Sequence, residues 1–218
     1  HAGPRPRGGC VKFGPVPLGA AEGAIAAHSI RSEGLVIKKG TRLGAIEIAA
    51  LATAGVREVV VAQLEAGDIH EDAAAGALAT RIAGEQVRVE APFTGRSNLF
   101  ALTDGVVAVD RVGVDGFNAL DEAITLATLP DLSPVKAGDM VATVKIIPFA
   151  VSGTLVDEAL SRAAPLLTVH PFVRRRVAVI STLLPGLMPK VVEKTLRVTA
   201  ERLARAGALI AQDIRIPH

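Results

Sequence analysis

The sequence predicts an α/β fold, in which an N-terminal mixed α/β unit is followed by the start of a doubly wound parallel sheet. Two observations predict this class. Residues 34–64 read as strand, helix and strand, and residues 177–216 repeat the same order. Half of the 218 residues are hydrophobic and 21% are charged, so the chain can bury a core. A disordered chain is therefore excluded.

The first of these units begins with the apolar run 34–40, which ends in a glycine turn and suits a short strand. Residues 45–54 place isoleucine and leucine at helical spacing among alanines, with Glu47 in the first turn and Gly55 as the stop. Residues 56–62 contain four valines, as in a strand covered on both faces. The alternative is one long helix interrupted at Gly55, which those valines disfavour.

We expect three segments along the chain. Residues 1–10 are rich in proline and glycine and read as a disordered leader, whose Cys10 has no partner for an internal disulfide. Residues 11–172 form the N-terminal mixed α/β region. Within it, residues 17–29 are dominated by small side chains and predict a helix that ends near His28. Residues 173–218 form the first β-α-β of a second domain, which we expect to be truncated.

The middle of the chain alternates strand and helix patterns. His70 lies among acids, but those acids also suit a helix N-terminus, so we assign no metal ligands. Asp121 and Glu122 are adjacent on an expected strand and point to opposite faces, which excludes a carboxylate dyad. We expect helices at 73–83, 114–119 and 154–164, and strands at 86–90, 105–110, 123–129, 140–147 and 166–170.

Two groups of residues in this region are candidates for binding an anion. In the turn 91–98, Arg96 offers a planar fork and Asn98 adds an amide beside the permissive Gly95. The alternative is a surface turn whose polar side chains bond their own backbone. Lys145 lies within an aliphatic strand, where an ammonium group must reach an edge or find an anion.

The last 50 or so residues carry the second group of candidates. Residues 177–180 form a continuous apolar run, residues 188–206 a long helix and residues 208–216 a further strand. Such crossovers bind ligands beyond the carboxyl ends of their strands. The connecting loop and helix start offer Thr182, Lys190 and Lys194 to an oxyanion. The alternative is an ordinary exposed helix start with solvated lysines.

Composition excludes several classes of partner. The formal net charge is only +2 and the basic residues are dispersed, so nucleic acid is not expected as a partner. No apolar run is long enough to cross a bilayer, and a cytoplasmic location follows as an expectation. Neither a phosphate-binding loop nor a dinucleotide fingerprint is present, so neither nucleotide class is supported.

The order of segments resembles a known family. Residues 39–61, Lys-Gly-Thr-Arg-Leu-Gly-Ala-Ile-Glu-Ile onward, resemble the segment that precedes the molybdopterin-binding domain of gephyrin-type molybdotransferases. Residues 176–182, Arg-Val-Ala-Val-Ile-Ser-Thr, resemble the first strand of that domain. With residues 92–99 and 141–149 included, the chain is similar to bacterial molybdopterin-binding proteins in which this module is often fused to a cytidylyltransferase.

This resemblance implies a molybdopterin-binding module of molybdenum cofactor biosynthesis that presents the pterin phosphate for a later step. Its ligand or substrate would be molybdopterin, with Mg²⁺ as an optional accompanying ion. Residues 183–187 depart from the Gly-Asp-Glu-Leu of the molybdotransferases, so the transfer chemistry does not carry over. The family's glycine-rich serine motif would lie past residue 218. The implied binding residues are Thr182, Lys190, Lys194, Arg96, Asn98 and Lys145.

Two other readings stay open. The chain could be a non-catalytic scaffold or oligomerisation domain, which the alanine-rich, aliphatic composition allows, and a homodimer is one form of it. It could also be part of a bifunctional molybdenum cofactor cytidylyltransferase, with the nucleotidyltransferase fused or supplied by a partner. The residues do not decide whether the chain is an enzyme, and they predict no metal ligands.

Overall fold

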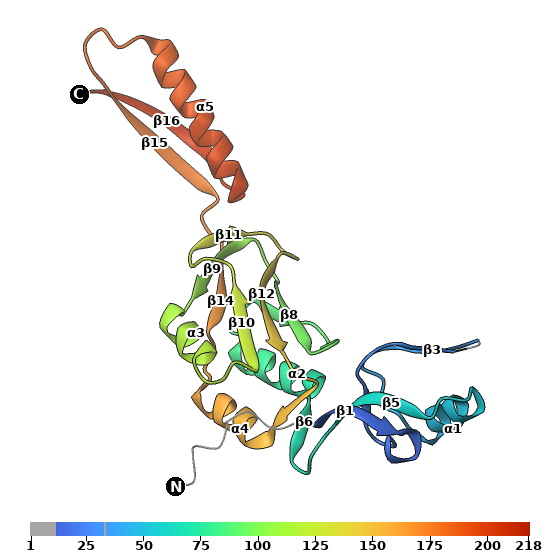
Figure 1. Cartoon of the computed structure of the whole chain (residues 1–218). Helices are drawn as coiled ribbons and strands as arrows, with labels where there is room; N and C mark the ends of the chain where they lie inside the picture. The colour runs from blue at the N-terminus through green and yellow to red at the C-terminus, as the bar shows by residue number, and fades with distance from the viewer. Residues whose placement is uncertain (1–11, 33) are drawn as a thin grey trace.

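The computed structural model describes residues 12–32 and 34–218, and it shows a mixed α/β chain whose sheets are mostly antiparallel. The predicted leader 1–10 lies outside the described residues. Figure 1 shows three parts along the chain, which we call the N-terminal part (12–63), the central part (68–171) and the C-terminal part (176–217). A doubly wound parallel sheet is not shown, because among the described strands parallel pairing within a sheet is confined to the two strands of the C-terminal part.

The N-terminal part is a small three-stranded antiparallel sheet with one helix and a hairpin. Strand β5 lies in the middle of the sheet and pairs with β1 and β2. The helix α1 begins after Gly44, whose N–H donates to the Glu47 carboxylate at 3.0 Å. The elements are β1 (Lys12–Pro17), a 3-10 turn η1 (Leu18–Ala20), β2 (Ile25–Ala26), β3 (Ile30–Ser32), β4 (Leu35–Ile37), α1 (Ala45–Thr53) and β5 (Glu58–Gln63).

The predicted helix at 17–29 is wrong. In its place the chain makes one 3-10 turn, then bends at Gly23 with φ +82° and adds the short strand β2 to the sheet. Residues 24–27 are buried here, against strand β5 and the turn at Thr41. The small side chains thus belong to a strand paired with β5 rather than to a helix face, because tertiary contacts override local propensity.

The central part contains a four-stranded antiparallel sheet in the order β10-β12-β8-β7, and helix α2 packs against β8 and β12. A second sheet has the order β11-β9-β14, and a short pair joins β13 to β6. The elements are β6 (Asp68–His70), α2 (Glu71–Ile82), β7 (Val87–Val89), β8 (Arg96–Ala101), β9 (Gly105–Val109), α3 (Arg111–Asn118), β10 (Ile124–Thr128), β11 (Ser133–Val135), β12 (Met140–Ile146), β13 (Ala150–Ser152), α4 (Gly153–Arg162) and β14 (Leu167–Pro171).

The central core is continuous from α2 to the two larger sheets. Leu78 and Ile82 on α2 are fully buried, as are Leu99 on β8 and Val144 on β12. Strands β8 and β12 alternate buried and more exposed residues, so one face of the sheet packs on the helix and the other faces out. This alternation determines which side chains of the sheet are available to a ligand.

The C-terminal part is a single β-α-β crossover, with β15 (Arg176–Leu183), α5 (Pro189–Arg205) and β16 (Leu209–Pro217). The parallel pairing that the sequence predicts for these two strands is confirmed, with Ile180 opposite Ile214 and Thr182 opposite Ile216. In Figure 1 this part projects away from the central part. Its two-stranded sheet leaves aliphatic side chains such as Ile180 exposed.

Candidate functional site

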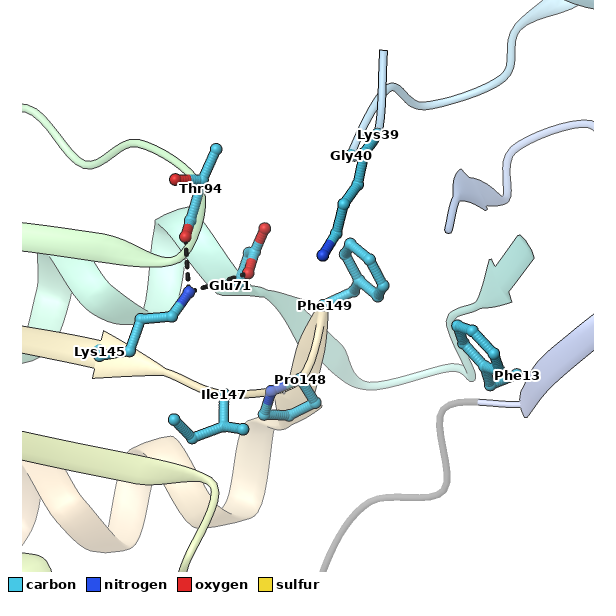
Figure 2. A pocket seen from close by; sticks show the side chains of 9 residues that line it. All are labelled: Phe13, Lys39, Gly40, Glu71, Thr94, Lys145, Ile147, Pro148 and Phe149. Atoms are coloured by element: carbon cyan, nitrogen blue, oxygen red, sulfur yellow. Dashed lines mark hydrogen bonds and ion pairs between the residues drawn. The ribbon is translucent and has the colours of Figure 1, made fainter. Parts of the chain in front are cut away.

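A cavity of about 590 Å³ lies where the N-terminal and central parts meet. This volume is within the range of small-molecule sites. Figure 2 shows Glu71, Thr94 and Lys145 on one side of the cavity and Phe13 on the other, with Lys39 and Phe149 between them. The N-terminal part contributes Phe13, Lys39 and Gly40, and the central part contributes Glu71, Thr94, Lys145, Ile147, Pro148 and Phe149.

Glu71 supplies the acidic group of the cavity. It is the first residue of α2, directly after His70, whose Nδ1 accepts the N–H of Asp72 at 3.2 Å. The Glu71 side chain is only 9% exposed. Burial raises the pKa of its carboxyl group above the usual range, while the positive charge of Lys145 acts in the opposite direction. A buried carboxyl group with a raised pKa in a cavity is a feature of functional sites.

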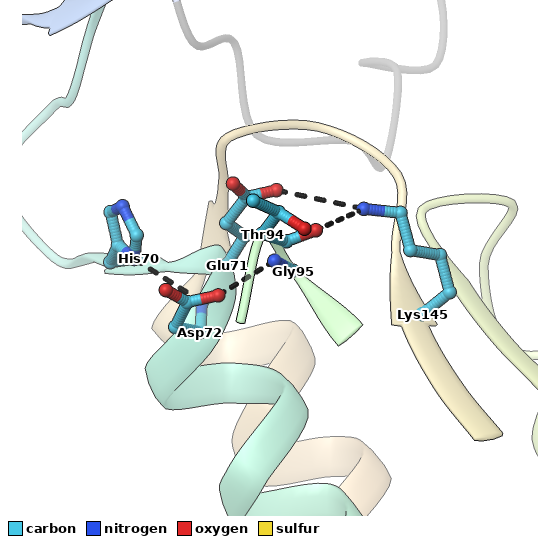
Figure 3. Close-up of polar contacts among 6 residues, drawn as sticks. All are labelled: His70, Glu71, Asp72, Thr94, Gly95 and Lys145. Atoms are coloured by element: carbon cyan, nitrogen blue, oxygen red, sulfur yellow. Dashed lines mark hydrogen bonds and ion pairs between the residues drawn. The ribbon is translucent and has the colours of Figure 1, made fainter. Parts of the chain in front are cut away.

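Lys145 lies at the end of β12 and turns toward Glu71. Its Nζ donates to the carbonyl of Thr94 at 2.6 Å and lies 3.8 Å from Oε2 of Glu71 (Figure 3). The Lys145 side chain is 29% exposed, so the ammonium group still reaches the cavity. This position agrees with the expectation from the sequence, since the lysine of an aliphatic strand lies beside an anion, Glu71.

The turn at Thr94 and Gly95 is held from two sides. Asp72 accepts the N–H of Gly95 at 2.6 Å, and Lys145 donates to the carbonyl of Thr94. Both turn residues have positive φ, +50° and +68°. A Cβ atom added at Gly95 would collide with Oε2 of Glu71, so only glycine permits this close approach. The turn therefore fixes the position of the Glu71 carboxylate.

The opposite wall of the cavity is apolar and carries one further cation. Nζ of Lys39 lies 5.4 Å from the centroid of the Phe149 ring. Phe13 and Ile147 line the same cavity with 60% and 59% of their surface exposed. Within residues 12–32 and 34–218, no hydrogen bond or ion pair joins the N-terminal part to the central part. The N-terminal and central parts are thus linked by contacts such as that of Lys39 with the Phe149 ring.

The structure brings together three of the predicted site residues, Arg96, Asn98 and Lys145. Arg96 lies directly opposite Lys145 in the pairing of β8 with β12. Asn98 lies on the same face of β8 and is held by Thr143, which donates to its amide oxygen at 2.9 Å, and by Glu90. The predicted turn 91–98 is therefore shorter than expected, because strand β8 begins at Arg96.

The other three predicted residues lie in the C-terminal part. Lys190 and Lys194 line a shallow groove of about 650 Å³ along α5, together with Arg202. No acidic residue lines this groove. Thr182 is exposed near the carboxyl end of β15, before the loop that leads to α5. In Figure 1 this part stands apart from β8 and β12, so the six predicted residues form two separate groups.

The sequence did not predict the roles of Glu71 and Lys39 in the cavity. Glu71 is one of the acids around His70 that suit a helix N-terminus, and it is the first residue of α2, but its burial depends on the distant turn at Thr94. Lys39 lies at the end of the apolar run 34–40, directly before Gly40, and nothing in this pattern indicates the neighbouring Phe149. The described residues contain no cluster of three or more His, Cys, Asp or Glu side chains suited to a metal ion.

Comparisons with known proteins give a single match. The family model DUF8806, a domain of unknown function, matches residues 15–63, which lie within the N-terminal part. No curated protein and no solved structure matches the chain. Among the described residues, no helix combines the length and apolar character needed to cross a membrane.

Proposed function

We propose that this chain is a cytoplasmic molybdopterin-binding module of molybdenum cofactor biosynthesis, and that it presents the pterin phosphate for a later step. In this proposal the C-terminal part is the beginning of a doubly wound sheet, and the phosphate lies beyond the carboxyl end of β15. The resemblance of the order of segments to molybdopterin-binding proteins supports the function. Molybdopterin, with Mg²⁺ as an optional companion, is the ligand.

One observation carries the proposal: Lys190 and Lys194 share an exposed groove with Arg202 and without any acid. Lysines three to four residues apart lie on one face of a helix, so their charges add at one place. Thr182 adds a hydroxyl group at the neighbouring strand end. A phosphate gains charge-assisted hydrogen bonds from such groups, which are stronger than neutral ones. Arg96, Asn98 and Lys145 lie elsewhere and are not part of this phosphate site.

The experiment is an anaerobic titration of the chain with molybdopterin. We expect the Lys190→Ala/Lys194→Ala double variant to bind at least about tenfold more weakly, because two charge-assisted contacts to the phosphate are lost. The matched control is Lys38→Ala/Lys136→Ala, which removes the same charge from exposed lysines outside the groove. Equal affinities for the two double variants would contradict the proposed site.

A scaffold function is favoured by a different observation, the open aliphatic face of the β15–β16 sheet. Ile180, Ile214 and Ile216 are exposed on neighbouring strands, and Thr182 lies opposite Ile216. Parallel sheets are usually covered on both faces. A homodimer in solution together with no affinity for molybdopterin would favour this second function. Cytidylyl transfer belongs to the proposal only where a nucleotidyltransferase is fused to this module or bound to it.

A further inference from the structure

The cavity between the N-terminal and central parts is chemically two-sided. Phe13, Phe149 and Ile147 present apolar side chains to the cavity, and Lys39 and Lys145 present ammonium groups to it. Aromatic rings favour stacking or edge contacts with a flat ring, and ammonium groups favour an anion. A ligand that satisfies both kinds of group therefore combines a flat apolar ring with a negative group.

The charges of the cavity limit that ligand to a single negative charge. Lys145 is paired with Glu71, so these two groups offset each other. Within residues 12–32 and 34–218, no carboxylate lies within ion-pair distance of Lys39, whose nearest defined partner is the Phe149 ring. Lys39 and Lys145 both act on the single carboxyl group of Glu71, so the two ammonium groups leave the cavity with a net positive charge.

The turn at Thr94 makes this arrangement a preformed one. Asp72 and Lys145 hold the turn by hydrogen bonds, and the turn itself packs against the Glu71 carboxylate. Because these groups are already bonded to one another, a ligand does not have to order them. Lys145 is held in place by these contacts, whereas Lys39 is an exposed side chain that can adjust to the ligand.

We propose that this cavity is a second ligand site, which binds a small aromatic carboxylate. Its ring lies against Phe13 and Phe149, and its carboxylate is held between Lys39 and Lys145. The site is independent of the phosphate groove on α5, because it is built from other parts of the chain. Since Lys39 and Lys145 come from different parts of the molecule, the bound carboxylate also links the N-terminal part to the central part.

The test compares naphthalene carboxylate with the uncharged naphthalene carboxamide, which has the same rings. Isothermal titration of the whole chain should show carboxylate binding at least about tenfold tighter than carboxamide binding, because the amide gains no charge-assisted contact. Equal affinities for the two probes, or no heat of binding for the carboxylate at about 1 mM, would overturn the proposal.

A matched pair of variants tests the position of the carboxylate. Lys39→Met should weaken naphthalene carboxylate binding about fivefold or more and leave carboxamide binding unchanged, whereas Lys38→Met should leave both unchanged. The two lysines are adjacent and exposed, but only Lys39 lines the cavity. Phe149→Leu should weaken both probes, because it removes the ring and keeps the charges. Equal effects of the two lysine variants would contradict the assignment.

The two sites are separable in the same experiment. Naphthalene carboxylate binding should be unaffected by the Lys190→Ala/Lys194→Ala variant, since those lysines line the α5 groove and not the cavity. Loss of molybdopterin binding without loss of carboxylate binding, or the reverse, identifies which of the two proposals has failed. Displacement of the carboxylate by molybdopterin would contradict the independence of the two sites.

Discussion

The central part and the C-terminal part of the molecule contain similar aliphatic strands but bury them to different extents. Leu99 and Val144 in the central sheet are fully buried, whereas Ile180 in β15 is 61% exposed. The two core clusters of the described residues reach no further along the chain than Val169. The apolar pattern of a strand therefore shows which side chains it can bury, and the elements packed around the strand determine whether those side chains are buried.

This difference follows from the number of elements around each strand. In the central part a strand such as β12 has two paired neighbours and a helix, α2, over one face. In the C-terminal part, counting the described residues alone, each strand pairs with one other, and α5 is the helix that packs against the pair. Two-stranded sheets are marginal unless something packs on them. The C-terminal part thus derives its stability mainly from the contact between α5 and its strands.

The largest predicted effect tests this difference in burial directly. Leu78→Ala in α2 should lower the free energy of unfolding by about 2–5 kcal/mol, because it leaves a cavity in a closed core. Leu203→Ala in α5, where the leucine is only half-buried, should cost about 1 kcal/mol. Urea unfolding followed by circular dichroism measures both. Similar losses of unfolding free energy for the two substitutions would contradict the difference in burial between the central and C-terminal parts.

The second prediction concerns one glycine in each part. Gly95 and Gly186 both have positive φ, but a Cβ at Gly95 would collide with the Glu71 carboxylate, whereas nothing lies within 4 Å of one at Gly186. Gly186→Ala should cost about 1 kcal/mol through backbone strain alone, and Gly95→Ala about 2–3 kcal/mol. The measurement is again urea unfolding. An equal loss of unfolding free energy at the two positions would show that the turn at Gly95 can move away from Glu71 without strain.

The third and smallest effect is the pH dependence of stability. Burial raises the pKa of Glu71 in the folded state, so the folded chain holds this proton to a higher pH than the unfolded chain. The free energy of unfolding therefore falls as pH rises from the ordinary pKa of a glutamate carboxyl group through the raised pKa of Glu71. Glu71→Gln should remove this fall.

The matched control for that prediction is Glu193→Gln in α5, where the carboxylate is exposed. Its unfolding free energy should follow that of the unsubstituted chain at every pH. Urea titrations at several pH values compare the three proteins. A pH dependence that survives in Glu71→Gln would show that another group is responsible.

Much of the secondary structure could be predicted from local patterns. The helices α1 and α5 and the strand β12 follow from periodicity within their own residues, and their observed bounds are close to those expected. The helix expected at 17–29 is wrong because residues 25–26 pair with β5 as a strand, a contact that no local pattern contains. Sheet partners were likewise unpredictable, because pairing joins distant strands.

The candidate sites show the same limit. Lys145 could be identified because a lysine within an aliphatic strand needs an anion, and the anion proved to be Glu71. Glu71 itself could not be identified, because its raised pKa depends on burial by the turn at Thr94 and Gly95. The proximity of Lys39 to Phe149 depends on how two parts of the chain meet. Features of a site that depend on how distant parts of the chain pack together can be identified only from the structure.

The most direct test of the proposed function is amide hydrogen exchange of the chain with and without molybdopterin. The proposal predicts slower exchange in the loop and first turns of α5, residues 182–196, and unchanged exchange in residues 94–98 and 143–147 of the central part. Protection confined to the central residues, or none in either region, would contradict a phosphate site at Lys190 and Lys194.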